Sequence, residues 1–503
     1  MNNNRRQTHR ATRNRPASAR SRTTARHTRG GQHTSGVKGA SITNVSPTMR
    51  ASGAAKTPST PNTLGTPGAS KASRAASTAT AAPEVRVPSN SETLVSRRNF
   101  LYGAIGVGAA AIAIGAGAAA YSSYKDAQES SQITYLEVPE DAVIALTDLE
   151  ALDSADDRLT MTATVDMRLG TLVWCNSDDV AACLVPTDSG SPLTTVSLVP
   201  LGSAADTTVL EAAVGAAEGF EIYDVRATAH GMIWTEANIL DGQWRIYTAP
   251  LSDLVMGTPV MVDSADETFE TPTIAAVENY AFWQVMPSMN TYENADVIPE
   301  TQLKRTTFGS SSVDVVYTSA RRFGTPLYAC EDGVVITPRA DSKSVYYQLT
   351  KIDAKSAQTV DQLTLPQGMA PLEAGYGKNG FMWSFEKIYS YGDGIANMGT
   401  YTPMTAPSAY NYDGKQWFCF GRTPTAAPAW CGDLLVVKSS YSVCGVDLAD
   451  KQYFALDVDN GADDYGEYLA STGTHERIVT FTSIDYQPVN EAAVQTCRIK
   501  IWA

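Results

Sequence analysis

Hydrophobic residues are distributed along this chain in two different ways. Residues Leu101–Tyr121 form one uncharged run rich in Ala, Gly and Ile. Beyond residue 133, short runs of Val, Ile, Thr, Tyr and Trp alternate with Gly, Asp, Asn and Pro, and long helical periodicity is scarce. Short runs bounded by turn residues are typical of β-strands. The pattern therefore predicts a polar spacer at residues 122–132 and an all-β body at residues 133–503, downstream of a single hydrophobic helix.

The apolar runs of the body recur as a unit in which a tight turn precedes the run. The ends of successive runs are separated by 60, 49, 53, 47, 53 and 43 positions, close to the roughly 50-residue period of four-stranded propeller blades. This spacing predicts a β-propeller of seven four-stranded blades, with six or eight left open, and predicts that the tryptophans pack between blades. The runs end at Trp174, Trp234, Trp283, Ile336, Trp383, Val436 and Val479.

The last unit lacks an outer strand. It offers strands at Arg477–Ile484 and Ala492–Trp502, and then the sequence stops. Either Ile133–Val138 or Val143–Leu146, which precede the first unit, would complete the last blade and protect both open edges. We therefore expect one of these two segments to close the ring.

Two of the units resemble a known family of propellers. Residues Pro326–Ile336 (PLYACEDGVVI) and Pro428–Val436 (PAWCGDLLV) are similar to the P-x-W-S-x-D-G-x-x-I repeat of TolB-like, WD-repeat-like β-propellers. The resemblance implies a platform that binds a ligand or a protein and has no fixed chemistry.

Charge divides the chain at the hydrophobic run. Residues 1–98 carry 17 Lys and Arg against 2 acidic residues, whereas the rest carries 22 against 51. Residues 1–95 are low in large apolar side chains and are predicted to be a disordered basic tail. Such a tail suits anionic lipid or nucleic acid, or is merely solvated, or lies upstream of a later start at Met49. The acidic body is not expected to bind nucleic acid.

The residues that lead into the hydrophobic run resemble the twin-arginine signal S-R-R-x-F-L-K, with Tyr102 in place of the final Lys. The resemblance implies export of a folded protein by the Tat translocase. The 21-residue run is long enough to cross a bilayer as a helix, with the basic side remaining cytoplasmic. The signal residues are Ser96, Arg97, Arg98, Phe100 and Leu101.

Two outcomes are open for residues 96–121. Ala118-Ala119-Ala120 offers a cleavage site, which would release the body from the cell. We favour retention as an anchor in the cytoplasmic membrane, with the C-terminal domain outside the cytoplasm.

Motifs of catalysis are scarce in the body. Its two histidines, His230 and His475, fall at predicted turns, and no metal, nucleotide or nucleophile-elbow motif is present, so no cofactor is predicted. The acidic cluster with Asp457, Asp459 and Asp463 is either a weak calcium site or a solvated loop. The seven cysteines are expected to be mostly small buried residues, although export leaves disulfides open.

Two insertions interrupt the repeated unit after its Trp strand, at Met286–Gln302 and Glu386–Gly399. They should emerge on one face of the propeller, as a binding surface or as loops packed on themselves. The candidate binding residues are Tyr292, Arg321, Arg322, Tyr389 and Tyr391.

Together these features favour an exported, membrane-tethered propeller that binds a protein, peptide or glycan without catalysis. The alternative is a propeller hydrolase of the glycosidase or lactonase type, with carboxylates on the central axis. A third hypothesis takes the basic tail as the functional end and the propeller as an external sensor.

Overall fold

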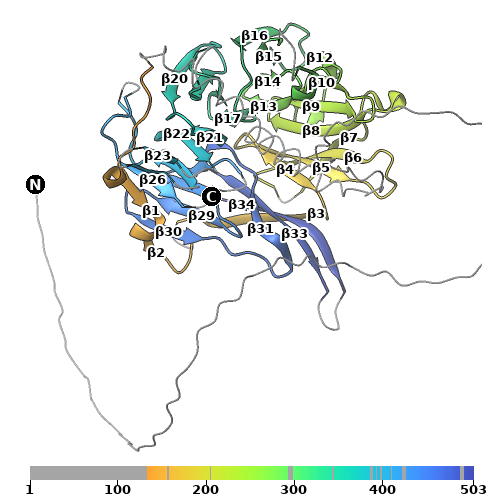
Figure 1. The fold of residues 1–503 in the computed structure, drawn as a ribbon. Coiled ribbons are helices and arrows are strands. Elements are labelled where there is room, and N and C mark those ends of the chain that lie inside the picture. Colours follow the sequence, from red (N-terminus) through yellow and green to blue (C-terminus); the bar gives the residue numbers. More distant parts are fainter. Residues whose placement is uncertain are drawn as a thin grey trace, which may run out of the picture. The chain divides into compact units, whose positions relative to one another are not determined.

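A computed structural model describes the fold of the body (Figure 1). The described residues are 133–155, 158–203, 205–292, 298–341, 345–385, 389–391, 394–396, 399–408, 411–421, 426–487 and 492–503. In this part of the chain, none of the helices combines the length and the apolar character needed to span a bilayer.

Six sheets in the described residues are each built from one continuous stretch of chain, with antiparallel strands added in order from the inside outwards. The first three are β4 (Leu172–Cys175), β5 (Val180–Pro186), β6 (Thr194–Pro200) and β7 (Thr207–Leu210); β8 (Glu221–Thr228), β9 (Gly231–Asn238), β10 (Gln243–Ser252) and β12 (Val260–Ala265), with β11 (Val255–Met256) beside β10; and β13 (Thr273–Val277), β14 (Tyr280–Val285), β15 (Thr301–Thr307) and β16 (Asp314–Ser319).

The next three continuous sheets follow in the same way. They are β17 (Tyr328–Cys330), β18 (Gly333–Ile336), β19 (Gln348–Asp353) and β20 (Thr359–Thr364); β21 (Pro371–Gly377), β22 (Gly380–Phe385), β25 (Gly399–Pro403) and β26 (Trp417–Phe420); and β27 (Ala429–Cys431), β28 (Leu434–Lys438), β29 (Val443–Asp447) and β30 (Gln452–Ala455). Outside the sheets are η4 (Ala216–Glu218), α2 (Met289–Tyr292) and a hairpin of β23 (Tyr389–Tyr391) with β24 (Gly394–Ala396).

A seventh sheet joins the two ends of the described chain. It consists of β31 (Ala462–Leu469), β33 (Ile478–Tyr486), β34 (Val494–Trp502) and, from the N-terminal side, β3 (Met161–Arg168). Figure 1 shows β3 lying beside β34. The short strand β32 (Gly473–His475) pairs instead with β27 of the sixth sheet. The propeller thus has six blades of continuous chain, one fewer than the seven predicted, and the last predicted unit belongs to this composite sheet.

Each pair of neighbouring sheets shares a hydrophobic cluster, including the pair formed by the seventh and the first sheets. Six tryptophans are fully buried in these clusters, as the sequence predicts for side chains that fill the space between blades. They are Trp234, Trp244, Trp283, Trp383, Trp417 and Trp430. Burial between sheets explains why tryptophan recurs at the period of the blade.

The segment that closes the ring differs from the prediction. Neither Ile133–Val138 nor Val143–Leu146 pairs with the last blade; β3 does so, over almost the whole length of β34. The nine-residue β34 needs a long partner, whereas only three residues of the predicted segment Val143–Leu146 form a strand. Alternation also favours β3, since Val165 and Met167 are buried and Asp166 between them is exposed.

The residues before β3 form a belt along the outer edges of the fourth, fifth and sixth sheets. The amide of Leu136 donates to the carbonyl of Thr364 at the edge of the fourth sheet (2.8 Å). After η2 (Glu140–Ala142), β1 (Val143–Ala145) pairs in parallel with β26; after η3 (Leu146–Asp148), β2 (Glu150–Ala151) pairs in parallel with β30. The belt occupies hydrogen-bonding edges that would otherwise be open.

Candidate functional site

The first strands of the continuous sheets lie next to one another around the axis of the ring, since β8 contacts β13, β13 contacts β17, and β17 contacts β21. Because the strands are antiparallel, each first strand begins on the same face on which its second strand ends. The face where the first strands begin is called the entry face below. Both predicted insertions follow second strands and therefore emerge on the entry face.

One predicted unit was aligned with the wrong strand of its sheet. The run at Gly170 belongs to β4, the first strand of its sheet, whereas the other runs form second strands. The second strand of this sheet is β5, which follows a turn at residues 176–179. Trp174 is consequently only half-buried, at the edge of the cluster between the first and second sheets, whereas the other repeat tryptophans are fully buried.

Glu373 on β21, near the axis, has a carboxyl with a strongly raised pKa. Burial raises the pKa of its carboxyl to about 8, although a hydrogen bond with Ser384 opposes the shift. Its Oε2 atom is buried and has no hydrogen-bond partner among the described residues. A carboxyl in this setting keeps its proton at neutral pH and can act as a general acid.

Tyr328 on β17 connects Glu373 with a second group of charges. Burial raises the pKa of the Tyr328 hydroxyl well above its ordinary value, and the nearby Glu373 carboxylate raises it further. The guanidinium of Arg226, on β8, acts in the opposite direction. Through these electrostatic effects, charged side chains of the second and fifth sheets act on a tyrosine of the fourth sheet.

Arg226 is itself held between a carboxylate and an aromatic ring. It forms an ion pair with Asp224, and its guanidinium carbon lies 4.4 Å from the centre of the Trp174 ring. Burial raises the pKa of Asp224, whereas its contact with Arg226 lowers it. Tyr223 lies alongside, with a pKa raised to about 12 by burial and by Asp224.

We call Trp174, Asp224, Arg226, Tyr328 and Glu373 the axial cluster. All five residues are partly exposed, although the Oε2 atom of Glu373 is itself buried, and they come from the first strands of four sheets. The cluster combines a carboxyl with a raised pKa, a carboxylate paired with a cation, and two aromatic side chains. Carboxyl groups in two such different environments are the kind of pair used in acid–base chemistry. Sequence reasoning missed the cluster; the available signal was a polar residue within an apolar first strand just after the recurring Pro, as at Tyr328 and Glu373.

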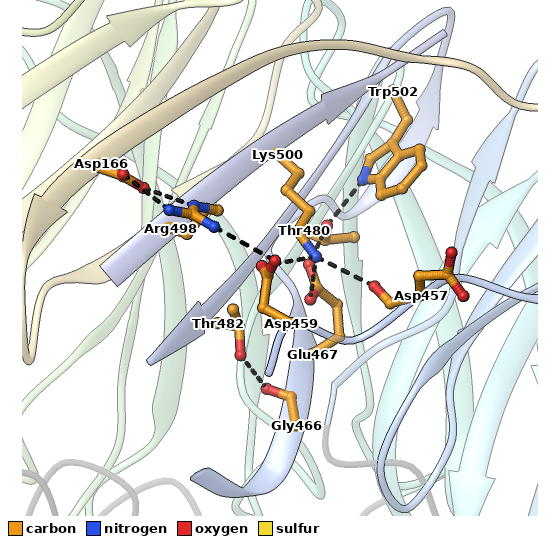
Figure 2. A network of polar contacts seen from close by, with 10 residues as sticks. All are labelled: Asp166, Asp457, Asp459, Gly466, Glu467, Thr480, Thr482, Arg498, Lys500 and Trp502. Atoms are coloured by element: carbon orange, nitrogen blue, oxygen red, sulfur yellow. Dashed lines mark hydrogen bonds and ion pairs between the residues drawn. The ribbon is translucent and has the colours of Figure 1, made fainter. Parts of the chain in front are cut away.

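The acidic cluster predicted as a weak calcium site belongs to an ion network in the seventh sheet (Figure 2). Asp459 pairs with Arg498 (3.3 Å) and Lys500 (3.0 Å), and the carbonyl of Asp457 accepts a hydrogen bond from Lys500 (3.1 Å). Asp463 instead accepts hydrogen bonds from the Tyr468 hydroxyl. Across the described ranges, no group of three or more His, Cys, Asp or Glu is arranged to hold a metal.

The predicted binding face stays a prediction, because the described side chains include only two of its five residues. Arg322 contacts Glu270 (2.5 Å) and the carbonyl of Pro287, so it fastens the insertion of the third sheet. Arg321 is exposed nearby. Tyr292 lies in α2, and Tyr389 and Tyr391 lie in β23. The export residues Ser96, Arg97, Arg98, Phe100 and Leu101 lie outside the described residues.

Both histidines of the body lie on the face opposite the entry face. His230 is exposed at the turn between β8 and β9, as predicted. His475 is buried in β32, where its Nε2 atom lies 2.7 Å from the carbonyl oxygen of Thr472, so it is a strand residue and the prediction of a turn was wrong. All seven cysteines are free and buried, as expected of small apolar residues.

Neither a family model nor a curated protein matches this sequence. The fold is similar to that of solved structures at low identity. A post-proline cleaving enzyme from Rickettsia typhi matches at 8% identity and a TM-score of 0.43, over 63% of this chain and 50% of that chain. A puromycin hydrolase matches at 11% and 0.39, over 64% and 50%. The propeller domain of the Trilobed protease from Pyrococcus furiosus matches at 9% and 0.38, over 67% and 96%.

This chain spans about half the length of the first two structures, so the likeness concerns the β-propeller fold. Structures named as prolyl or post-proline cleaving enzymes and as puromycin hydrolases are among these neighbours, and their names contradict the prediction of a non-catalytic binding protein. At this low identity the likeness itself shows the fold alone. The prediction failed because repeat motifs report how blades pack and not what chemistry the axis carries.

Proposed function

We propose that this protein is a glycoside hydrolase whose reaction takes place at the axial cluster. The observation that carries the proposal is the buried carboxyl of Glu373, with a pKa of about 8 and an unpartnered Oε2 atom. Glycoside hydrolysis generally needs one protonated and one ionised carboxyl, and Asp224 beside Arg226 supplies the second.

In the proposed reaction, Glu373 donates its proton to the oxygen of the leaving group as the glycosidic bond breaks. A water molecule forms the new bond to the sugar carbon and transfers a proton to the Asp224 carboxylate. The ion pair with Arg226 favours the ionised form of Asp224, against the effect of its burial. Trp174 and Tyr328 offer aromatic faces of the kind on which sugar rings stack. The proton then returns from Asp224 to Glu373 through solvent, which restores the resting enzyme.

The proposal is tested with the full chain and a panel of p-nitrophenyl glycosides. Neutral and amino sugars come first, because the acidic body repels anionic glycans. At least one glycoside should be hydrolysed, at a rate that falls as pH rises through about 8, where Glu373 loses its proton. Glu373→Gln should lower the rate at least 100-fold. Glu211→Gln, which changes an exposed carboxylate away from the axis, is the matched control.

Failure of every glycoside, or full activity of a folded Glu373→Gln protein, would contradict the proposed function. Thermal unfolding of each variant separates a catalytic defect from a folding defect.

The proposal includes export by the Tat translocase and action outside the cytoplasmic membrane. Its support is the sequence around Ser96–Tyr121 and the likeness of two units to TolB-like propellers. Fractionation of cells, followed by mass spectrometry of the mature N-terminus, tests this placement. Peptides from residues 50–95 on the membrane-bound protein are expected for an anchor. A secreted protein that begins near Tyr121 would contradict retention, and a wholly cytoplasmic protein would contradict export.

A further inference from the structure

Residues Ala470–His475 lie outside the strands of the seventh sheet and contact other sheets. Within this segment, β32 pairs in parallel with β27 of the sixth sheet, with His475 opposite Cys431. The amide of Thr472 donates to the carbonyl of Cys175, at the end of the first sheet's inner strand (3.2 Å). We call Ala470–His475 the crossing segment.

The crossing segment also touches the fourth sheet, which lies on the other side of the ring. A Cβ atom on Gly473 would lie 2.9 Å from the Cα atom of Cys330, at the end of β17. Gly473 also has a φ of +92°, a conformation that side chains disfavour. Only a glycine permits this approach of two backbones from the fourth and seventh sheets. The contact spans the axis of the ring.

Asn176 fastens the crossing segment from the first sheet. Its side-chain Nδ2 donates to Thr472 Oγ1 (2.9 Å), and its Oδ1 accepts from the amide of Ala276 in the third sheet (3.4 Å). Asp178 in the same turn accepts hydrogen bonds from the amides of Glu476 (2.8 Å) and Arg477 (3.1 Å). The crossing segment or its fastening residues therefore contact five sheets in addition to the seventh: the first, third, fourth, fifth and sixth.

The axial cluster lies on the entry-face side of the crossing segment. Cys175 and Cys330, which touch the segment, are the last residues of β4 and β17. Trp174 and Tyr328 come one and two residues earlier in the same strands. Each residue of a strand rises by about 3.3 Å. The side chains of Trp174 and Tyr328 therefore lie only one or two residues along the strand from the crossing segment.

We infer that the axis is open to a substrate from the entry face alone, so that the axial cluster binds the end of a glycan chain and not its middle. This inference rests on the proposed glycoside hydrolase activity and adds the mode of action, which is exo. A glycan bound in its middle needs an exit on both sides of the reacting unit, and the backbone contact between Gly473 and Cys330 removes one of them.

The first test needs no activity and measures hydrogen–deuterium exchange of the full chain. The amide of Thr472, bonded to Cys175, should exchange as slowly as amides in the core strand β28. Asn176→Ala should accelerate it at least tenfold, whereas Asn238→Ala, which alters a surface turn of the second sheet, should not. Exchange of Thr472 at the rate of exposed loops would show that the axis opens, and would overturn the inference.

The second test follows the products from a linear hexasaccharide with a fluorescent label at its reducing end, made of the sugar that the glycoside panel identifies. The exo mode predicts free monosaccharide at the first time point and labelled products that shorten one unit at a time. Early fragments of middle length would overturn the inference. If no glycoside is hydrolysed, the proposed function fails, whereas slow exchange at Thr472 would still establish the closed axis.

Discussion

Asp166 on β3 and Arg498 on β34 form a two-point ion pair between residues that are 332 positions apart, with distances of 2.7 and 3.0 Å. The pair joins the strand that closes the ring to the last strand of the chain, and it raises the pKa of Arg498. Both side chains are partly exposed, so solvent weakens the attraction. Arg498→Met should lower the free energy of unfolding by about 1 kcal/mol, measured by urea denaturation.

Arg498→Lys should recover only part of this loss, because an ammonium cannot contact both carboxylate oxygens. Equal stability of the Met variant and the unaltered protein would show that β3 is held by its backbone pairing alone.

Lys500 and Glu467 are more deeply buried in the same ion network. Removing one of their charges should therefore lower the free energy of unfolding more than Arg498→Met does. Glu467 is fully buried and accepts hydrogen bonds from Lys500 (2.9 Å) and Thr480 (2.6 Å) (Figure 2). Glu467→Leu leaves the ammonium of Lys500 in a low-dielectric interior, where Asp459 alone remains as its anionic partner. We expect a loss of about 3 kcal/mol in urea unfolding.

The double variant Glu467→Leu/Lys500→Met should regain most of that loss, since it removes both charges. A double variant that is no more stable than Glu467→Leu would mean that packing, and not charge, governs this site.

Gly473 provides a test of the close contact across the axis. Gly473→Ala adds a Cβ atom 2.9 Å from Cys330 and also strains a positive φ. Gly414, with a φ of +66° and no atom near the added Cβ, is the matched control. Thermal unfolding should show a loss of about 1 kcal/mol for Gly414→Ala and about 3 kcal/mol for Gly473→Ala. Equal losses would mean that the two backbones move apart easily.

The propeller could be predicted from the sequence because its blades repeat the same turn residues, and a turn residue acts on the backbone of its own hairpin. Gly380 and Gly432, at turns between first and second strands, do adopt positive φ values. Gly170 also has a positive φ but precedes a first strand, so the same local signal misassigned Trp174. That error explains the long first interval of 60 residues, because the true second strand begins later, at Val180.

The closing strand and the axial cluster depend on contacts between distant segments. The sequence shows that an outer strand is missing, but the choice of β3 over Val143–Leu146 follows from the length of β34 and from pairing across the whole chain. Similarly, Glu373 is unremarkable in sequence. Its raised pKa arises from burial by other strands and sheets, which a local pattern does not reveal.

Glu373 should make stability depend on pH below about 8. Burial raises its pKa from 4.5 to about 8 in the folded protein. Between these values the unfolded chain releases the proton while the folded protein keeps it, so the free energy of unfolding falls as pH rises. Glu373→Gln should remove this slope and be more stable than the unaltered protein at pH 8, by about 2 kcal/mol. The measurement is urea unfolding at pH 5, 6, 7 and 8. Parallel pH curves for the two proteins would contradict the buried, protonated state.

Lys438 should make the free energy of unfolding rise with pH, at pH values above the range in which Glu373 acts. Its side chain is fully buried and donates to the carbonyl of Tyr465 (2.7 Å), and burial lowers its pKa from 10.5 to about 8. Between these values the unfolded chain holds the proton that the folded protein has released, so stability rises with pH from about 8 to about 10. Lys438→Met should abolish that rise and stabilise the protein at pH 7, by about 1 to 2 kcal/mol after the lost hydrogen bond is counted. Differences in unfolding free energy between the variant and the unaltered protein at pH 7, 8, 9 and 10 cancel the titration of other groups. A difference that stays constant across this range would show that Lys438 remains charged in the fold.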